Sequence, residues 1–85
     1  MPEEMVGKIA SYFKKIDVAA IDITQNGLKV GDTIHIQGHT TNFTQKVDSM
    51  QIEHQSVQEA KPGDSIGIKV IDAVRHGDAV YKVIE

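Results

Sequence analysis

The chain contains no cysteine and no tryptophan, and only two prolines. Without cysteine it has no disulfide framework, no thiol nucleophile and no zinc–thiolate site. A secreted protein of only 85 residues would usually need disulfides, so we expect a reducing, cytoplasmic setting. Seven glycines and 40% apolar residues are ordinary for a folded protein and exclude a disordered or low-complexity chain.

Long hydrophobic runs are also missing. No apolar segment approaches the roughly 18 residues that a membrane-spanning helix needs. The first four residues, Met1–Glu4, include two glutamates where a signal peptide would be basic. We therefore expect no membrane segment and no export signal.

The chain has no excess of positive charge, because 9 Lys+Arg face 12 Asp+Glu, a formal net charge of −3. This lowers the expectation of nonspecific nucleic-acid binding, which comes mainly from phosphate neutralisation. The length predicts a single domain over residues 1–85, too small for a deep, strained active site. Phosphate-binding loops, dinucleotide motifs and an activated nucleophile are absent as well, so we expect no enzymatic activity and no cofactor.

Short alternating apolar segments separated by turn residues predict an all-β fold. In Asp32–Gln37, for example, Ile34 and Ile36 alternate with polar residues. Free strand edges promote aggregation, so a small closed barrel is favoured over an open sandwich. The predicted strands are Val18–Ile23, Asp32–Gln37, Gln45–Glu53 with a bulge between Asp48 and Ser49, Ile66–Val70 and Val80–Ile84.

The first 16 residues are ambiguous between helix and strand. Met5, Ile9, Tyr12 and Ile16 have helical spacing. Against a helix stand Gly7, which costs about 1 kcal/mol in a helix interior, and the apolar continuation into the next strand. We interpret this segment as a strand.

A Gly-Asp phrase recurs three times, each time before a small residue and an aliphatic one. Turn chemistry explains it better than ligand binding, because glycine supplies positive φ and aspartate bonds its own turn backbone. Lys61-Pro62-Gly63-Asp64 in particular predicts a type II turn. The other two copies are Gly31-Asp32 and Gly77-Asp78.

The four histidines do not predict a metal site. His35 and His39 have the spacing of a helical metal pair, but on a strand they lie about 13 Å apart. We expect His35 to be an exposed strand residue, and His54 and His76 to lie beside turns.

Folding explains the polar segment from Gly38 to Lys46 least well. Its hydroxyl groups and the ring of Phe43 predict either a surface for phosphate, ribose or a stacked base, or a structural role. For Phe43 we favour the structural role, a plug at one end of the barrel. Basic residues of several turns either add a local positive patch or only increase solubility. The candidate RNA- or partner-binding residues are Lys14, Lys15, His39, Thr40, Thr41, Lys46, Arg75 and His76.

Three longer phrases of the sequence span Leu28–Ile36, Phe43–Gln51 and Ala60–Ile68, and two shorter ones span Val6–Ile9 and Val18–Ile21. Together these phrases resemble the second domain of translation GTPases such as elongation factor Tu and initiation factor two. The resemblance implies a closed six-stranded Greek-key barrel and supports a strand at the N-terminus. The Val-Gly-Asp turn, Phe43-Thr44-Gln45 and Gly77–Tyr81 are also similar to the C-terminal barrel of collagenase-like peptidases.

These resemblances imply a binding function without catalysis. The nucleotide-binding domain of the translation GTPases is absent from the 85 residues, so we expect no GTP binding. The leading hypothesis is a translation-factor-like module that contacts RNA or a ribonucleoprotein, such as tRNA or the ribosome. The alternative is a protein-interaction module, such as an accessory partner of a collagenase-like peptidase, and the net charge favours this alternative.

Overall fold

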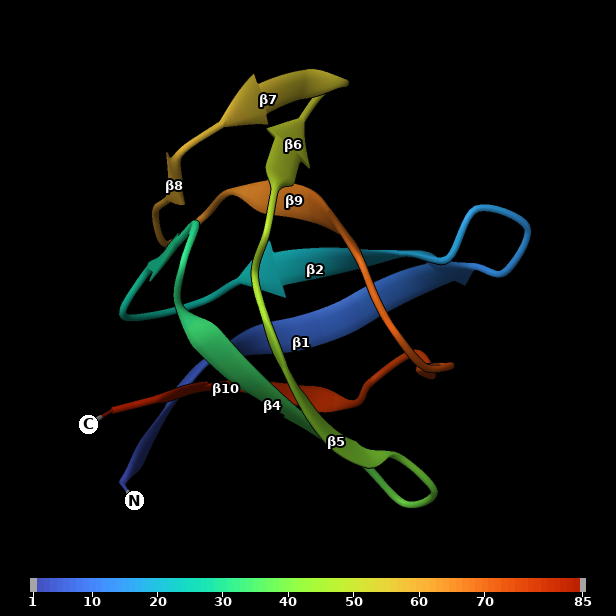
Figure 1. The fold of residues 1–85 in the computed structure, drawn as a ribbon. Helices are drawn as coiled ribbons and strands as arrows, with labels where there is room; N and C mark the ends of the chain where they lie inside the picture. Colours follow the sequence, from blue (N-terminus) through green and yellow to red (C-terminus); the bar gives the residue numbers. More distant parts are fainter. Residues whose placement is uncertain (1, 85) are drawn as a thin grey trace.

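Ten β-strands and no helix form in residues 2–84, the part of the chain that the computed structural model describes (Figure 1). The predicted all-β class is therefore confirmed. In chain order the strands are β1 (Glu3–Phe13), β2 (Val18–Ile23), β3 (Leu28–Lys29), β4 (Thr33–Gln37), β5 (Asn42–Lys46), β6 (Met50–Ile52), β7 (Gln55–Val57), β8 (Glu59–Ala60), β9 (Ser65–Lys69) and β10 (Ala79–Val83).

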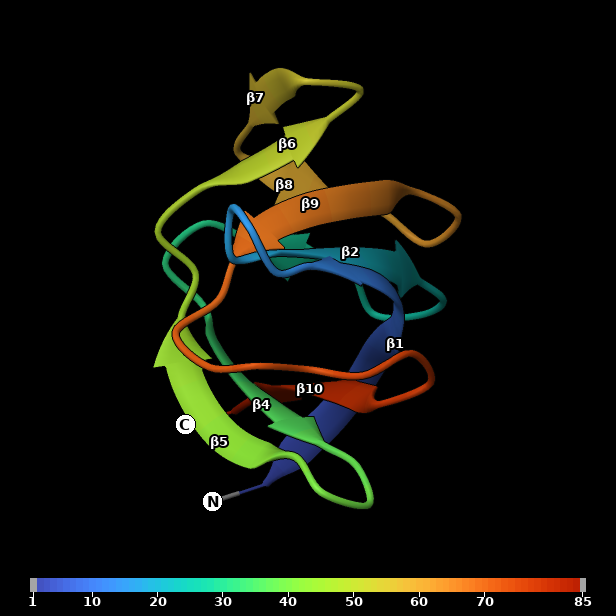
Figure 2. The same ribbon diagram turned by 90° about the vertical axis from the view of Figure 1, so that its right-hand side faces the viewer.

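Eight strands form one antiparallel sheet in the order β5-β4-β10-β1-β2-β9-β6-β7, and β3 pairs with β8 in a second, small sheet. The large sheet curls on itself, so that β2 and β9 face β4, β5 and β10 across the interior (Figure 2). It does not close, because β5 and β7 are its two edges. The prediction of a closed six-stranded barrel is thus not confirmed.

The inward faces of the curled sheet form one apolar core. The predicted alternation holds on β4, where Ile34 and Ile36 are fully buried and their neighbours face outward, and on β9, where Ile66 and Ile68 are buried. Five partly buried aromatic or aliphatic side chains pack against this core: Tyr12, Val30, Phe43, Ile52 and Val57. These strands therefore contribute their inward-facing side chains, every second residue, to the apolar core.

The N-terminal segment is a strand, as predicted, and its helix-like spacing has a structural cause. The register of β1 shifts between Met5 and Gly7 against β10, and between Ile9 and Ser11 against β2. Such bulges add one residue and change which face the following side chains take. Val6 and Ile9 are consequently both buried although they lie three positions apart.

The three Gly-Asp phrases form the same turn, which confirms the structural interpretation. Their glycines have φ of 98°, 98° and 90° for Gly31, Gly63 and Gly77. In each turn the aspartate carboxylate accepts a hydrogen bond, at 2.8–2.9 Å, from the backbone N–H three residues earlier. These donors are the N–H groups of Lys29, Lys61 and Arg75.

Each turn is also paired with a buried residue of a distant segment. The backbone N–H of the glycine donates a hydrogen bond to the carbonyl of the distant residue. The backbone N–H of the distant residue donates in return to the carbonyl of the aspartate, and all these bonds are 2.7–2.8 Å long. The partners are Val47, Ile23 and Ile9 for the first, second and third turns. The repeated phrase therefore joins the start of a strand to the core at three places.

The prediction of one bulged strand over Gln45–Glu53 is wrong. Strand β5 ends at Lys46 and β6 begins at Met50. Val47 and Met50 are both buried because they anchor the two ends of a link between different parts of the sheet. The buried positions change from odd to even numbers, from Val47 to Met50, because the chain leaves the sheet between them and not because one strand contains a bulge.

Candidate functional site

The eight candidate binding residues lie in separate parts of the surface. Lys14 and Lys15 are exposed in the β1–β2 turn, and Lys46 is exposed at the end of β5. The remaining residues lie in the β4–β5 turn and in the turn before β10. Figures 1 and 2 both show the β1–β2 turn well apart from the β4–β5 turn. A single continuous basic surface is therefore not formed by this set.

Part of the set does meet. Thr40, Thr41 and Arg75 line a shallow hollow of about 330 Å³, beside Phe43. Thr41 is only 4% exposed, so little of it is available to a ligand. Phe43 lies on β5 and packs against the core, in line with the favoured structural role, although it belongs to a strand and not to a loop.

A different feature distinguishes the end of the molecule at the β1–β2 turn. Three large apolar side chains are exposed in residues 2–84: Phe13 at 52%, Ile16 at 60% and Ile71 at 74%. Phe13 ends β1 and Ile16 lies within the β1–β2 turn, and both line the same groove, whereas Ile71 lines a different hollow. The Asp17 carbonyl accepts a hydrogen bond of 2.8 Å from the Val70 N–H. We call the side chains of Phe13 and Ile16 the turn-end patch.

An apolar groove of about 390 Å³ begins at the turn-end patch. Its floor includes Ala20 and Gly67, which are directly paired between β2 and β9. Because these residues have small side chains or none, the outer face of the sheet is hollowed there. Phe13 and Ile16 line the groove on one side, and residues of the β6–β7 turn line it as well. Such a groove accommodates apolar side chains of a partner.

The base of the turn is held by polar contacts. Asp17 adopts a positive φ of 55°, and the Tyr12 hydroxyl donates to its carboxylate at 3.5 Å. Burial raises the pKa of the Tyr12 phenol, and the nearby Asp17 carboxylate raises it further. Asp17 therefore contacts Tyr12 through its carboxylate and Val70 through its carbonyl at the base of this turn.

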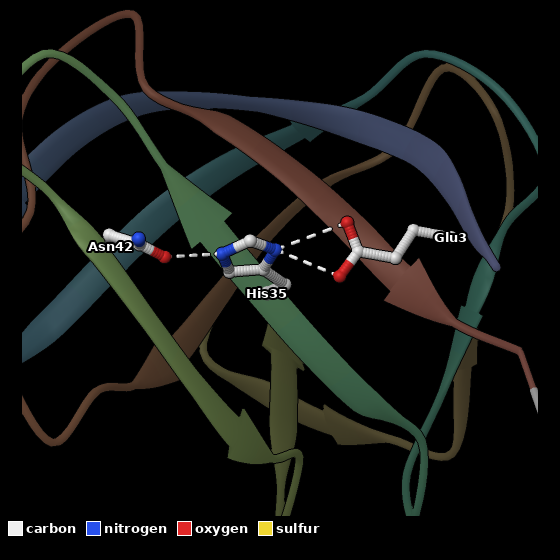
Figure 3. Close-up of polar contacts among 3 residues, drawn as sticks. All are labelled: Glu3, His35 and Asn42. Atoms are coloured by element: carbon white, nitrogen blue, oxygen red, sulfur yellow. Dashed lines mark hydrogen bonds and ion pairs between the residues drawn. The ribbon is translucent and has the colours of Figure 1, made fainter. Parts of the chain in front are cut away.

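A second polar cluster lies on the outer face of the sheet and joins three strands (Figure 3). Nδ1 of His35 lies 2.8 Å from Oε2 of Glu3, and Nε2 lies 2.5 Å from Oδ1 of Asn42. The ring also lies against Tyr81, with centroids 6.2 Å apart. Only 16% of the His35 side chain is exposed, so the expectation of an exposed strand histidine is wrong.

Both ring nitrogens of His35 face oxygen acceptors. An imidazole that donates from both nitrogens carries a proton on each and is positively charged. The hydrogen bond to Asn42 raises the pKa of His35, the bond to Glu3 raises it further, and partial burial opposes them. The cluster is a structural clasp between the beginning of β1 and the β4–β5 pair.

No group of three or more His, Cys, Asp or Glu residues in residues 2–84 could hold a metal ion. These residues also contain no helix long and apolar enough to cross a membrane.

Comparison with known proteins identifies peptidase relatives. An uncharacterized protease of Methanocaldococcus jannaschii is 43% identical over 81 residues, which are 94% of this chain and 20% of that protein. A collagenase of Porphyromonas gingivalis is 40% identical over 78 residues, 91% of this chain and 22% of that protein. The chain is a homologue of one part of these proteases.

The solved structures agree with this assignment. The C-terminal domain of a putative U32 peptidase from Geobacillus thermoleovorans superposes with a TM-score of 0.88 at 21% identity, over 95% of this chain and 93% of that domain. No protein-family model matches the chain. The chain thus has the fold of a U32 peptidase C-terminal domain and spans about one fifth of the curated relatives it matches.

The turn-end patch was not predicted from the sequence. A signal was present, because Phe13 and Ile16 are large apolar residues on either side of Lys14-Lys15, where a turn would normally be polar. Of the two, only Ile16 belongs to the helical spacing of Met5, Ile9 and Tyr12, and Phe13 stands outside it.

Proposed function

We propose that the chain is a non-catalytic protein-interaction module that docks on the catalytic part of a U32-type peptidase. The observation that carries this proposal is the turn-end patch beside an apolar groove, on a chain homologous to one fifth of known proteases. Contiguous apolar surface rimmed by polar residues is typical of protein-binding sites. A module that makes up a fifth of a larger enzyme has the rest of that enzyme as its natural partner.

The proposal is tested with the collagenase of Porphyromonas gingivalis, prepared at full length and without its 78 matching residues. We expect the chain to bind the shortened enzyme in calorimetry and to bind the full-length enzyme more weakly, because the enzyme's own segment competes. Replacing both Phe13 and Ile16 by serine removes two apolar anchors. This should weaken binding by about 30-fold, or roughly 2 kcal/mol.

Lys14→Ser in the same turn is the matched control. It removes charge but no apolar surface, so it should leave peptidase binding nearly unchanged. If only Lys14→Ser weakens binding, or if the shortened enzyme does not bind although its circular dichroism shows that it is folded, the proposal is wrong.

RNA binding stays a prediction from the translation-factor resemblance. Its candidate residues occupy separate areas, and the net charge of −3 gives no general attraction to phosphate. The peptidase relatives support the protein-interaction alternative instead. Treating a pull-down with ribonuclease separates the two, since a directly bound peptidase survives the treatment and a partner bridged by RNA is lost.

A further inference from the structure

The turn between β2 and β3 contains an asparagine of a chemically reactive kind. Asn26 is followed by Gly27, and the two residues have φ of 65° and 66°, the pair of positive values that an Asn-Gly sequence favours. Asparagine is one of the thermolabile residues of proteins. It reacts fastest before glycine, because glycine has no side chain to hinder attack by its own backbone nitrogen.

The reaction needs only water, and Asn26 is exposed. The Gly27 nitrogen loses its proton and bonds to Cγ of Asn26, while the bond from Cγ to the amide nitrogen breaks. Ammonia leaves and a cyclic imide, a succinimide, remains. Water then opens the ring at either of its carbonyls. One opening gives aspartate, and the other gives isoaspartate, in which the main chain runs through the side chain and is one bond longer. In sum, one water is consumed and one ammonia is released.

In the folded chain both reacting groups are held by hydrogen bonds. The Gly27 N–H donates to the Gln25 carbonyl at 2.8 Å. The side-chain NH₂ of Asn26 donates to the Met5 carbonyl at 2.9 Å. A carbonyl only accepts, so the NH₂ group and not the side-chain oxygen faces Met5. Formation of the succinimide removes the proton of the first bond and the nitrogen of the second, so both bonds must break.

The turn is also held between two strands. The N–H groups of Thr24 and Gln25 donate to the Val6 carbonyl, at 2.8 and 3.3 Å, where β1 bulges. On the other side, a Cβ added to Gly27 would lie 2.9 Å from the carbonyl oxygen of Ala60 in β8. The turn therefore has little room to rearrange while it is packed against β1 and β8.

We propose that Asn26 is a site of spontaneous modification that reacts only when the turn has separated from β1, and that the reaction makes this local opening irreversible. Aspartate or isoaspartate at this position has carboxylate oxygens in place of the NH₂ group, so it cannot donate to the Met5 carbonyl. Isoaspartate also lengthens a turn whose two ends, Ile23 and Leu28, are fixed in the core. This inference does not depend on the turn-end patch or on a peptidase partner.

The test follows both asparagines of the complete chain by peptide mass spectrometry, after incubation in mildly alkaline buffer with and without guanidinium chloride. Asn42, which precedes Phe43, is the control in the same sample. In the denaturant we expect Asn26 to react at least about tenfold faster than Asn42. In the folded chain we expect Asn26 to react at least about tenfold more slowly than in the denaturant, because an opening that costs about 1.4 kcal/mol reduces the reactive population tenfold.

The modified chain carries an added negative charge, so ion exchange separates it from the unmodified chain. We expect its unfolding equilibrium constant to be about fivefold higher, the effect of losing one modest hydrogen bond. Asn26→Asp, which mimics one product, should show the same increase. Asn26→Gln keeps an amide but does not form the succinimide, so its stability should survive the same incubation unchanged.

Two results overturn the inference. One is that Asn26 reacts equally fast in the folded and the unfolded chain, and the other is that the separated modified chain is as stable as the unmodified one. Both are measured on the wild-type sequence, so the inference stays testable even if a variant does not fold.

Discussion

The Glu3–His35–Asn42 clasp predicts that the protein loses stability as pH rises. The pKa of His35 is raised in the folded chain, chiefly by its hydrogen bond to Asn42 and then by Glu3. A raised pKa means that the folded state holds the proton more tightly than the unfolded state. The stabilisation is therefore complete below the ordinary histidine pKa of about 6.5 and is lost as pH rises through the higher folded value.

The size of the effect follows from the geometry of the two hydrogen bonds. A hydrogen bond from a charged group contributes about 1.5–3 kcal/mol where it is shielded from water. The Glu3 side chain is 32% exposed, so its share is closer to the ~0.2–1 kcal/mol of a surface pair. We expect about 1–2 kcal/mol in total, with roughly 4–8 °C in Tm for each kcal/mol in a domain of this size.

The assay is an NMR titration of the histidine rings combined with urea unfolding. The pKa of His35 should lie above the ordinary histidine value of about 6.5, and unfolding near pH 5.5 should cost about 1–2 kcal/mol more than near pH 8.5. Glu3→Gln should reduce that difference, whereas Glu4→Gln, at the exposed neighbouring position, should not.

The opposite arrangement would refute this reasoning. If the NH₂ group of Asn42, and not its oxygen, faced the ring, it would donate to Nε2 and hold His35 neutral. His35 would then titrate at or below the ordinary value, and the stability difference between the two pH values would be the same in wild type and Glu3→Gln.

Three further predictions concern stability, and each is checked by urea unfolding. Gly7→Ala should lower the free energy of unfolding by about 3 kcal/mol or more, because the new Cβ would collide with a backbone carbonyl of β2. Gly31→Ala should lower it by only about 1 kcal/mol, because this position has positive φ but open space around it. Equal losses for the two variants would contradict the close contact between Gly7 and β2. Asp78→Ala should cost about 2–3 kcal/mol against about 1 kcal/mol for Asp64→Ala, since Asp78 is only 6% exposed and its bond to the Arg75 N–H is partly buried, whereas the bond of Asp64 is exposed; the reverse order would contradict this. Ile71→Ser should change stability by no more than about 0.5 kcal/mol, because the side chain is largely exposed, and a larger loss would show a structural role.

The sequence predicted those parts of the fold that local chemistry determines. The strands over Val18–Ile23 and Ser65–Lys69 were predicted within a residue or two, because inward and outward positions alternate there. The Gly-Asp turns were predicted from glycine's access to positive φ and the carboxylate's reach to its own backbone. In each case the residues that set the conformation are within a few positions of one another.

Features without such a local cause were missed. The hairpin between β6 and β7 turns at Glu53 and His54, with φ of 51° and 66°. A turn beside His54 was predicted, but tight hairpin turns usually contain asparagine, aspartate or glycine, so the two-residue hairpin and strand β7 were not. The clasp was missed for another reason, because Glu3 and His35 are 32 positions apart and meet only through the order of the strands. Single-sequence periodicity contains no information about that order.

The same distinction explains why the fold was predicted better than the function. The phrases that resemble translation factors, and also collagenase-like peptidases, consist of strand and turn residues such as Ile34, Gly63 and Asp64. Residues that set strands and turns specify a fold and not a partner. Phe13 and Ile16 of the turn-end patch lie outside every one of these phrases. The residues on which the proposed docking depends are therefore not among those that carry the resemblance.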